Sequence, residues 1–408
     1  MNITGIITEY NPLHNGHIYH LKKSKELTSS DAIVCVMSGN FVQRGVPAII
    51  DKWERTKFAI DNGIDLLLEL PTVYAISSAE FFAYGSVATL NSLGCINNIC
   101  FGSELGDINT LKTIAKILVE EPMQYKHHLK QHLGTGTSFP TARSFALSQY
   151  ILNNSLLNIS SDHLNTILNS SNNILGIEYC KSLIKLNSSL IPYTIQRKGS
   201  SYNETELSNE FASATSIRKF IYQNDELQNL STFLPRNVFE SLIQLKTNDY
   251  DYVNPEKAFS YIKYKIIMNP DSLLSLPDIE EGMGNRILDA FIKSNSLEEA
   301  INKIKSKRYT FTRIYRLLFQ LYLGFDNIPY KKLRTVEPNY IRVLGFNTKG
   351  KEILNSIKKN IDIPLIASVT KKHNSILHND INATNLYSLL NNNVKYGDDF
   401  YRKPYIIK

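Results

Sequence analysis

Short apolar runs alternate with helical segments from residue 1 to about residue 110, and this alternation limits the fold more than any other feature of the chain. Strands are predicted over Ile3–Thr8, Ala32–Met37, Ile64–Leu70 and Ile96–Gly102. Because strands that are apolar along their whole length need cover on both faces, the pattern predicts a Rossmann-like α/β domain with a parallel sheet. Ligands of such sheets bind beyond the carboxyl ends of the strands, so a functional site is expected in the turns that follow them.

The rest of the chain is predicted to be mainly helical. A helix is expected at 172–186, a strand at Tyr193–Lys198 and a short helix at Ser213–Tyr222. Strand signals then fade, and the later predicted helices cover 236–246, 255–267, 284–304 and 309–323. We therefore predict two domains, an α/β domain over residues 1–225 and a mainly α-helical, basic domain over 226–408.

Composition places the chain in a broad class. Of its 408 residues 43% are apolar and 20% are charged, a balance typical of soluble globular proteins. No apolar run approaches the roughly 20 residues that span a bilayer, and the N-terminus lacks the basic and apolar regions of a secretory signal. The four cysteines are irregularly spaced, so we expect buried reduced thiols. A cytoplasmic protein without membrane contact is expected, and no feature implies a protein partner.

Positive charge is concentrated in one part of the chain. Residues 303–359 hold fourteen Lys or Arg against three acids, an excess of eleven, whereas the net charge of the whole chain is +7. Within this part, the segment Lys303–Arg316 interleaves cations with Tyr309, Phe311 and Tyr315. That composition is common in RNA-binding segments. On its own it fits an ordinary solvated helix face equally well.

The first predicted strand runs into the sequence Glu9-Tyr10-Asn11-Pro12-Leu13-His14-Asn15-Gly16-His17. Pro12 ends the strand, and a helix opens at the H-x-G-H segment. His14 and His17 are three residues apart, so both imidazoles can face one side of the first helical turn, where backbone N–H groups also lack partners. The combination suits a triphosphate, with both histidines as catalytic candidates that hold oxygens while pyrophosphate leaves the α-phosphate.

Other sites at this turn are disfavoured. A zinc site built from His14, His17 and His20 would have Glu9 as its one nearby acid and no thiol, so no metal-ligand set is predicted. The chain contains neither the P-loop pattern nor a G-x-G-x-x-G after a strand, which counts against the usual mononucleotide and dinucleotide sites.

A second phosphate-binding candidate is the helix start Ala212-Ser213-Ala214-Thr215-Ser216-Ile217-Arg218. Ser213 is a good N-cap, and Thr215 and Arg218 can donate to phosphates. The two segments together resemble the HIGH-type nucleotidylyltransferase superfamily, whose second motif is a serine- and threonine-rich helix start. Ala212 and Ala214 depart from that motif, and Ala214 removes one possible phosphate donor.

Longer motifs narrow the resemblance to one family. The chain is similar to the bacterial tRNA(Met) cytidine acetate ligases over nearly its whole length. The matching segments are Glu9–His17, Met37–Gly45, Phe101–Glu104, Asn172–Gly176, Glu281–Arg286 and Ser306–Arg313.

The resemblance implies a reaction. ATP and acetate form acetyl-adenylate with release of pyrophosphate, and the acetyl group passes to N4 of the wobble cytidine of elongator tRNA(Met), giving N4-acetylcytidine and AMP. Mg²⁺ is expected to accompany the triphosphate. The residues expected to contact ATP are Ile7, Thr8, Glu9, Tyr10, Asn11, Pro12, Leu13, His14, Asn15, Gly16, His17, Ile18, Tyr19, His20, Gly102, Asn172, Asn173, Arg197, Ser213, Thr215 and Arg218. Asn172 and Asn173 remain alternatives, because either can instead serve the helix that begins there.

Two further assignments complete the predicted site. Arg44 follows the second strand in a loop flanked by Gly39 and Gly45, which leave the loop free to close. Our hypothesis is that Arg44 lies near acetate or phosphate, and a solvent-facing loop arginine is the equal alternative. The expected tRNA-binding residues are Lys305, Lys307, Arg308, Arg313 and Arg316.

Two other functions remain open at this point. One is a cofactor adenylyltransferase that acts on a phosphorylated small molecule, although such chains are normally much shorter. The other is a non-catalytic RNA-binding protein, against which the intact His14, Gly16 and His17 count.

Overall fold

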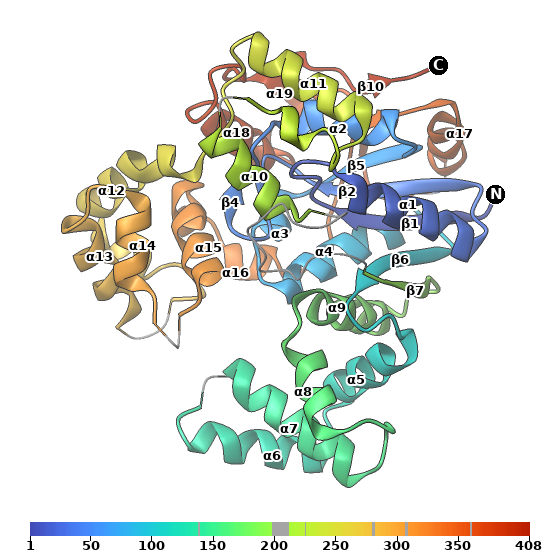
Figure 1. The fold of residues 1–408 in the computed structure, drawn as a ribbon, viewed down its shortest axis with the longest axis vertical. Coiled ribbons are helices and arrows are strands. Elements are labelled where there is room, and N and C mark those ends of the chain that lie inside the picture. Colours follow the sequence, from blue (N-terminus) through green and yellow to red (C-terminus); the bar gives the residue numbers. More distant parts are fainter. Residues whose placement is uncertain (138, 198–211, 225, 280–281, 307–308, 360) are drawn as a thin grey trace.

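A mostly parallel sheet forms the centre of the computed structural model, which describes residues 1–137, 139–197, 212–224, 226–279, 282–306, 309–359 and 361–408. Its strand order is β10-β8-β5-β2-β1-β6-β7, and β9 pairs with β8 (Figure 1). The strands are β1 Ile3–Thr8, β2 Ala32–Ser38, β5 Leu66–Leu70, β6 Asn98–Ser103, β7 Ile191–Gln196, β8 Ile341–Phe346, β9 Leu365–Ile366 and β10 Tyr405–Ile406. All of these pairings are parallel except that of β5 with β8.

Helices cover both faces of the sheet, as the apolar strands require. On one face, side chains such as Val34 and Leu68 pack in a core shared with α4, α5 and α9. On the other face, Cys35 and Leu67 pack in a core shared with α1, α2 and α10. The bounds are α1 Asn15–Thr28, α2 Lys52–Asp61, α4 Ala79–Asn91, α5 Ile108–Glu120, α9 Ser171–Lys185 and α10 Ala214–Gln223. The α/β fold predicted from the alternation is therefore confirmed.

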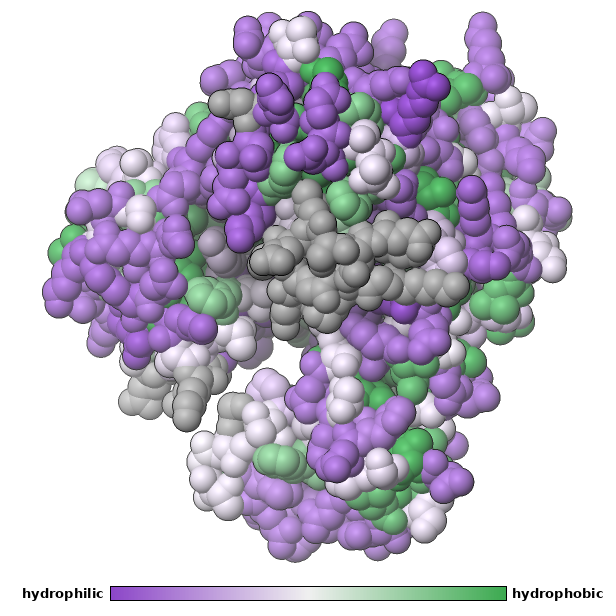
Figure 2. All heavy atoms as spheres, viewed as in Figure 1, coloured by the Kyte–Doolittle hydropathy of each residue, from purple (hydrophilic) through white to green (hydrophobic). Residues whose placement is uncertain are grey.

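Two helical lobes extend from the sheet (Figure 1). The first follows β6 and contains α5 and the helices α6 Met123–Gly134, α7 Phe139–Asn153 and α8 Ser161–Asn169. The second contains α12 Phe259–Met268, α13 Met283–Ile292, α14 Leu297–Ile304 and α15 Phe311–Tyr322. In this second lobe α15 lies on the side that faces the sheet, and the space-filling view is hollowed between the two lobes (Figures 1 and 2).

Most predicted elements have the expected type, and their ends shift by a few residues. The helix predicted over 284–304 is wrong as one element, because α13 ends at Ile292 and α14 begins at Leu297. The cause is a local cap: Ser296 Oγ accepts a hydrogen bond from the Glu299 amide at 3.1 Å and starts a new helix.

The remaining elements lie mostly in the second half of the chain. They are β3 Phe41–Val42, β4 Val46–Pro47, α3 Thr72–Ala75, η1 Gln228–Leu230, α11 Arg236–Thr247, η2 Pro255–Ala258, η3 Pro270–Leu273, η4 Phe325–Asn327, α16 Tyr330–Leu333, α17 Thr348–Ile357, η5 Lys371–His373, α18 His378–Tyr387 and α19 Asp398–Tyr401. Across the described residues, no helix combines the length and apolar character needed to cross a membrane.

The C-terminal part is mainly helical up to α16, and then the chain returns to the sheet of the N-terminal part. β8 pairs with β5, with Leu66 opposite Phe346, although no strand was predicted there. The predicted division into 1–225 and 226–408 stays a prediction, but the main sheet itself contains strands from both sides of residue 225.

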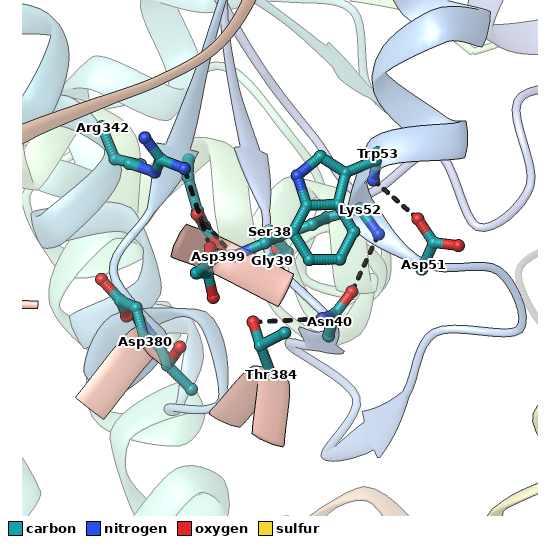
Figure 3. Close-up of polar contacts among 12 residues, drawn as sticks. Ser38, Gly39, Asn40, Asp51, Lys52, Trp53, Arg342, Asp380, Thr384 and Asp399 are labelled. Atoms are coloured by element: carbon teal, nitrogen blue, oxygen red, sulfur yellow. Dashed lines mark hydrogen bonds and ion pairs between the residues drawn. The ribbon is translucent and has the colours of Figure 1, made fainter. Parts of the chain in front are cut away.

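A buried charge cluster ties the returning segment to the N-terminal strands (Figure 3). Lys52 Nζ lies 2.8 Å from a carboxylate oxygen of Glu69 and 2.8 Å from one of Asp399, and all three side chains are almost fully buried. Arg342 of β8 adds a fourth charge, with Nη2 3.7 Å from Asp399. Charges removed from water need such partners, so the cluster fixes the C-terminal segment against β5 and α2.

Candidate active site

The H-x-G-H turn forms the floor of a cavity at the carboxyl end of β1. His14 is the N-cap of α1, and its Nδ1 accepts a hydrogen bond from the Gly16 amide at 3.1 Å. His17 Nδ1 in turn accepts from the His14 amide at 3.2 Å, and the two rings stack with centroids 3.8 Å apart. Because Nδ1 of each ring is an acceptor, the neutral imidazoles carry their proton on Nε2. Each ring thus has an N–H to donate to a ligand.

Burial keeps these imidazoles neutral. It lowers the pKa of His14 to about 3, with Arg197 and Arg218 acting in the same direction. Burial also lowers the pKa of His17 well below its ordinary value, with His14 as the next cause, and lowers that of His20 to about 4. His20 Nε2 is buried and has no hydrogen-bond partner among the residues that the structure describes, so a ligand could supply one.

A second group of donors faces the turn from α10. Ser213 caps this helix, with its Oγ accepting from the Ser216 amide at 3.1 Å. Thr215 Oγ1 accepts from Arg44 Nη1 at 2.8 Å and from Arg218 Nη2 at 3.2 Å. Arg218 Nη1 also donates to the Asn11 carbonyl at 2.7 Å, which fixes α10 against the turn after β1. Two guanidinium groups therefore converge on one hydroxyl, an arrangement suited to phosphate or carboxylate.

Most of the predicted ATP residues line the same cavity. Those at its wall are Ile7, Thr8, Glu9, His14, Gly16, His17, Tyr19, His20, Gly102, Asn172, Arg197, Ser213, Thr215 and Arg218, and Arg44 joins them. Segments from β1, α1, β6, α9, β7 and α10 thus meet at one place, as expected for the carboxyl edge of a parallel sheet.

The other predicted contacts lie outside the cavity wall. Tyr10, Asn11, Pro12 and Leu13 are buried in the turn itself, Asn15 donates through Nδ2 to the Thr232 carbonyl, and Ile18 packs on the core. Asn173 is also buried, and its Oδ1 accepts from the Leu105 amide at 3.0 Å. Of the two asparagines, Asn172 therefore lines the cavity, while its Nδ2 donates to Glu104 at 2.7 Å.

The sequence did not indicate several wall residues. They are Gln43, Phe82, Phe101, Leu175, Tyr179, Ile195, Gln196, Ala212 and Ala214. Most are apolar side chains on α4, α9, β6 and β7. In the sequence, such residues follow the same apolar pattern as residues of the core, so they cannot be told apart from them. Phe101 and Tyr179 show why, since their rings pack together with centroids 5.2 Å apart and belong at once to the core and to the cavity.

The start of the loop that carries Arg44 is held in place at Gly39, one of the two glycines expected to leave the loop free. Arg55 is fully buried and donates to the carbonyls of Glu9 at 2.7 Å and Ser38 at 3.0 Å, and also to that of Gly39. A Cβ added at Gly39 would lie 2.5 Å from Glu69 Oε1. Glycine is therefore needed there for close packing, and these contacts fix the start of the loop at Ser38 and Gly39.

The predicted basic residues are only partly brought together. Lys305 is exposed and its Nζ lies 4.3 Å from the centre of the Phe311 ring, whereas Lys307 and Arg308 fall outside the described residues. Arg313 and Arg316, on α15, line a second cavity together with Ser78 and Asp278.

The lysines and arginines that the structure describes within residues 303–359 do not form one continuous surface. Arg342 is buried in β8, and the cations of α17 lie on the opposite side of the molecule from α15 (Figure 1). Arg334 is buried in a bidentate ion pair with Asp278, at 2.6 and 2.7 Å. The surface next to the active-site cavity is therefore the one formed by α15.

The part of the chain that the structure describes contains no group of three or more His, Cys, Asp or Glu that could hold a metal ion. Glu9 is the acidic side chain at the cavity wall, and its Oε1 accepts from the Gln43 amide at 2.9 Å.

Comparison with known proteins agrees with this geometry. The model of the family described as HIGH Nucleotidyl Transferase matches residues 1–399. A tRNA(Met) cytidine acetate ligase of Clostridium novyi is 52% identical over the full length of both chains, and one of Clostridium perfringens is 51% identical over the full length of both. The crystal structure of Thermotoga maritima TmcAL bound with alpha-thio ATP is 34% identical and covers 100% of this chain and 99% of that one, with a TM-score of 0.89. The chain is therefore an ATP-dependent ligase that belongs to the tRNA(Met) cytidine acetate ligase family of HIGH nucleotidyl transferases.

Proposed function

We propose that the chain activates acetate with ATP and transfers the acetyl group to N4 of the wobble cytidine of elongator tRNA(Met). The observation that carries this proposal is the meeting of two sets of donors at one cavity. The neutral His14 and His17 rings offer Nε2–H groups, and Arg44 and Arg218 converge on Thr215 at the wall of the same cavity. Donors fixed before the reaction stabilise charge that develops on a phosphate.

In the first step a carboxylate oxygen of acetate attacks the α-phosphorus of ATP. The bond from that phosphorus to the bridging oxygen breaks, and pyrophosphate leaves with the electron pair. In this proposal His14 and His17 donate to oxygens of the α-phosphate, while Arg44, Thr215 and Arg218 hold acetate or the leaving pyrophosphate. Gly102, Asn172 and Arg197 lie on the β6–β7 side and are assigned to the nucleoside.

In the second step N4 of cytidine attacks the carbonyl carbon of acetyl-adenylate. The bond from that carbon to the phosphate oxygen breaks, AMP leaves, and N4 gives up one proton to give N4-acetylcytidine. Acetate alone is a poor acyl donor, and its bond to AMP supplies the leaving group that makes attack by a weakly basic amine feasible.

Among the residues described, the cavity wall offers one carboxylate as a ligand for Mg²⁺. This ion is usually held by one or two carboxylates together with substrate phosphates and water. Glu9 is the carboxylate at the cavity wall that could hold it, and the ion would neutralise charge on the departing pyrophosphate.

Binding of tRNA is assigned to the segment around α15, with Lys305, Lys307, Arg308, Arg313 and Arg316. Support comes from the position of this helix beside the hairpin that carries Arg44, since the RNA must present its cytidine to the adenylation cavity.

The proposal is tested by supplying labelled acetate and ATP with and without tRNA(Met). Acetate-dependent release of pyrophosphate and label in the tRNA are expected. Transfer of AMP to a small phosphate ester would instead identify a cofactor adenylyltransferase. A protein that binds tRNA without ATP turnover would be an RNA-binding protein without catalytic function.

A further inference from the structure

The hairpin that carries Arg44 is packed directly on the basic helix α15. Its strands are β3 and β4, and Gln43, Arg44 and Gly45 form the turn between them. The Phe41 ring of β3 lies against two aromatic rings of α15, with centroids 6.1 Å from Phe319 and 6.3 Å from Tyr322. Figure 1 shows β4 beside α15.

Gly45 makes the closest contact between the two. Its φ is +81°, and a Cβ added there would lie 2.3 Å from the backbone nitrogen of Arg316 and 2.5 Å from its Cα. No side chain can move aside to make room, because the obstacle is helix backbone. The turn therefore lies flush on α15 only if residue 45 is glycine, which tolerates both the contact and the backbone conformation.

The other side of the same turn is fastened to the adenylation cavity. Arg44 donates to Thr215 of α10 at 2.8 Å, and the Gln43 amide donates to Glu9 of the turn after β1 at 2.9 Å. Three consecutive residues thus contact the basic helix, the phosphate-binding helix and the end of β1. The hairpin backbone therefore connects α15 to the residue that carries the Arg44 guanidinium.

We propose that Gly45 is a positioning residue that couples occupancy of α15 by tRNA to the affinity of the cavity for ATP. The inference rests on the proposed function, because it takes tRNA as the polyanion on α15. When RNA phosphates fix Arg313 and Arg316, the hairpin is held against the helix and Arg44 is held at Thr215, where the triphosphate needs it. By linkage, ATP then strengthens the binding of tRNA by the same factor.

The experiment measures nucleotide affinity in a state that cannot react. Calorimetry gives the Kd of the α,β-methylene analogue of ATP with and without saturating unmodified tRNA(Met) transcript. In the wild-type protein the transcript is expected to tighten the analogue by about 5-fold or more, in the usual range of coupling between sites. In Gly45→Ala the ratio is expected to fall to about one when each protein is saturated with transcript at its own measured affinity.

Gly324→Ala is the matched control. Gly324 follows α15, has a φ of +80°, and has nothing within 4 Å of an added Cβ. The substitution therefore carries the same backbone penalty without the close contact, and the coupling should survive. Equal coupling in wild type and Gly45→Ala would overturn the proposal, as would absence of coupling in the wild type.

If Gly45→Ala does not fold, hydrogen exchange in the wild-type protein tests the coupling between the transcript and the hairpin instead. Exchange at the Gln43 and Gly45 amides, which donate to Glu9 and Val42, should slow when the transcript binds. Unchanged exchange with bound transcript overturns the coupling alone. A protein that does not bind the transcript in an anisotropy titration overturns the coupling and the proposed function together.

Discussion

Arg44 and Thr215 are 171 positions apart in the chain, and Nη1 of the arginine donates to Oγ1 of the threonine over 2.8 Å. Arg218 reaches the same oxygen at 3.2 Å. This contact joins the loop after β2 to the start of α10 and places two guanidinium groups at the cavity wall.

Arg44→Ala is expected to lower the rate of acetate-dependent AMP release on the order of 100-fold, the usual cost of removing a preorganised donor to a developing charge. Arg44→Lys keeps the charge without the planar fork and should recover only part of the rate. The rates are measured with labelled ATP at saturating acetate. Wild-type turnover by Arg44→Ala would remove this residue from the mechanism.

His14→Asn separates the two roles of His14. Asparagine is a good N-cap, so its side-chain oxygen can accept from the Gly16 amide and the melting temperature should change little. The Nε2–H donor is lost, and the rate of pyrophosphate release should fall by on the order of 100- to 1000-fold. His127→Asn, at an exposed position of α6, serves as the control and should be fully active. A large loss of stability in His14→Asn would mean that capping requires the imidazole itself.

Binding of ATP is expected to take up protons below about pH 6. The folded protein holds the pKa of His14 at about 3 and that of His20 at about 4, so both rings are neutral when the cavity is empty of phosphate. A triphosphate favours the charged imidazolium and raises both pKa values toward the ordinary value of about 6.5. At pH 5 to 6 the complex therefore binds more protons than the free protein.

Calorimetry in buffers of different ionisation enthalpy measures this uptake. Proton release on binding at pH 5.5 would contradict the assignment of neutral histidines. In the unliganded protein the same lowered pKa values reduce stability as the pH falls from about 6.5 towards 3, because the unfolded chain binds these protons more readily.

The turn at His14–His17 could be predicted because its contacts are local. The donor and the acceptor of each hydrogen bond lie two or three residues apart, so a short stretch of sequence includes both. Likewise the apolar runs of β1, β2 and β5 carried enough of a pattern to predict a parallel sheet.

The break between α13 and α14 has a local cause, the cap at Ser296, but the other unpredicted features depend on distant partners. β8 contains Arg342, whose burial is possible only because Asp399 and the carbonyl of Ala367 lie beside it. Gly45 reads as a flexible loop residue until the backbone of Arg316 is known to touch it. The sequence shows an excess of lysine and arginine over residues 303–359, but the fold places these side chains on different parts of the molecule.

Affinity for tRNA should fall steeply with salt, because each phosphate contact releases counterions. Arg316→Ala should reduce the slope of log K against log salt by about 0.7 to 0.9, the value for one contact. Lys351→Ala removes an exposed cation from α17, on the opposite side of the molecule, and should leave the slope unchanged. The slopes are obtained by anisotropy titrations over a series of KCl concentrations. Equal effects of the two substitutions would argue against the surface of α15.

Lys52→Met should destabilise the protein by about 3 to 5 kcal/mol, because it leaves Glu69 and Asp399 buried without their shared cation. The free energy of unfolding is measured by urea titration. Lys23→Met breaks an exposed pair with Glu26 and should change the free energy of unfolding far less, because water screens that pair. Similar values for the two variants would show that the cluster in Figure 3 does not fix the C-terminal segment.

The antiparallel pairing of β5 with β8 also bears on how the protein is made. On the ribosome β5 emerges long before residues 341–346, and until then its edge presents unpaired backbone groups. A nascent chain that already has the His14–His17 turn still lacks the strand that completes the sheet behind it. The sheet behind the nucleotide cavity is therefore completed only after residue 346 has been made, and until then the edge of β5 is open to pairing with other chains.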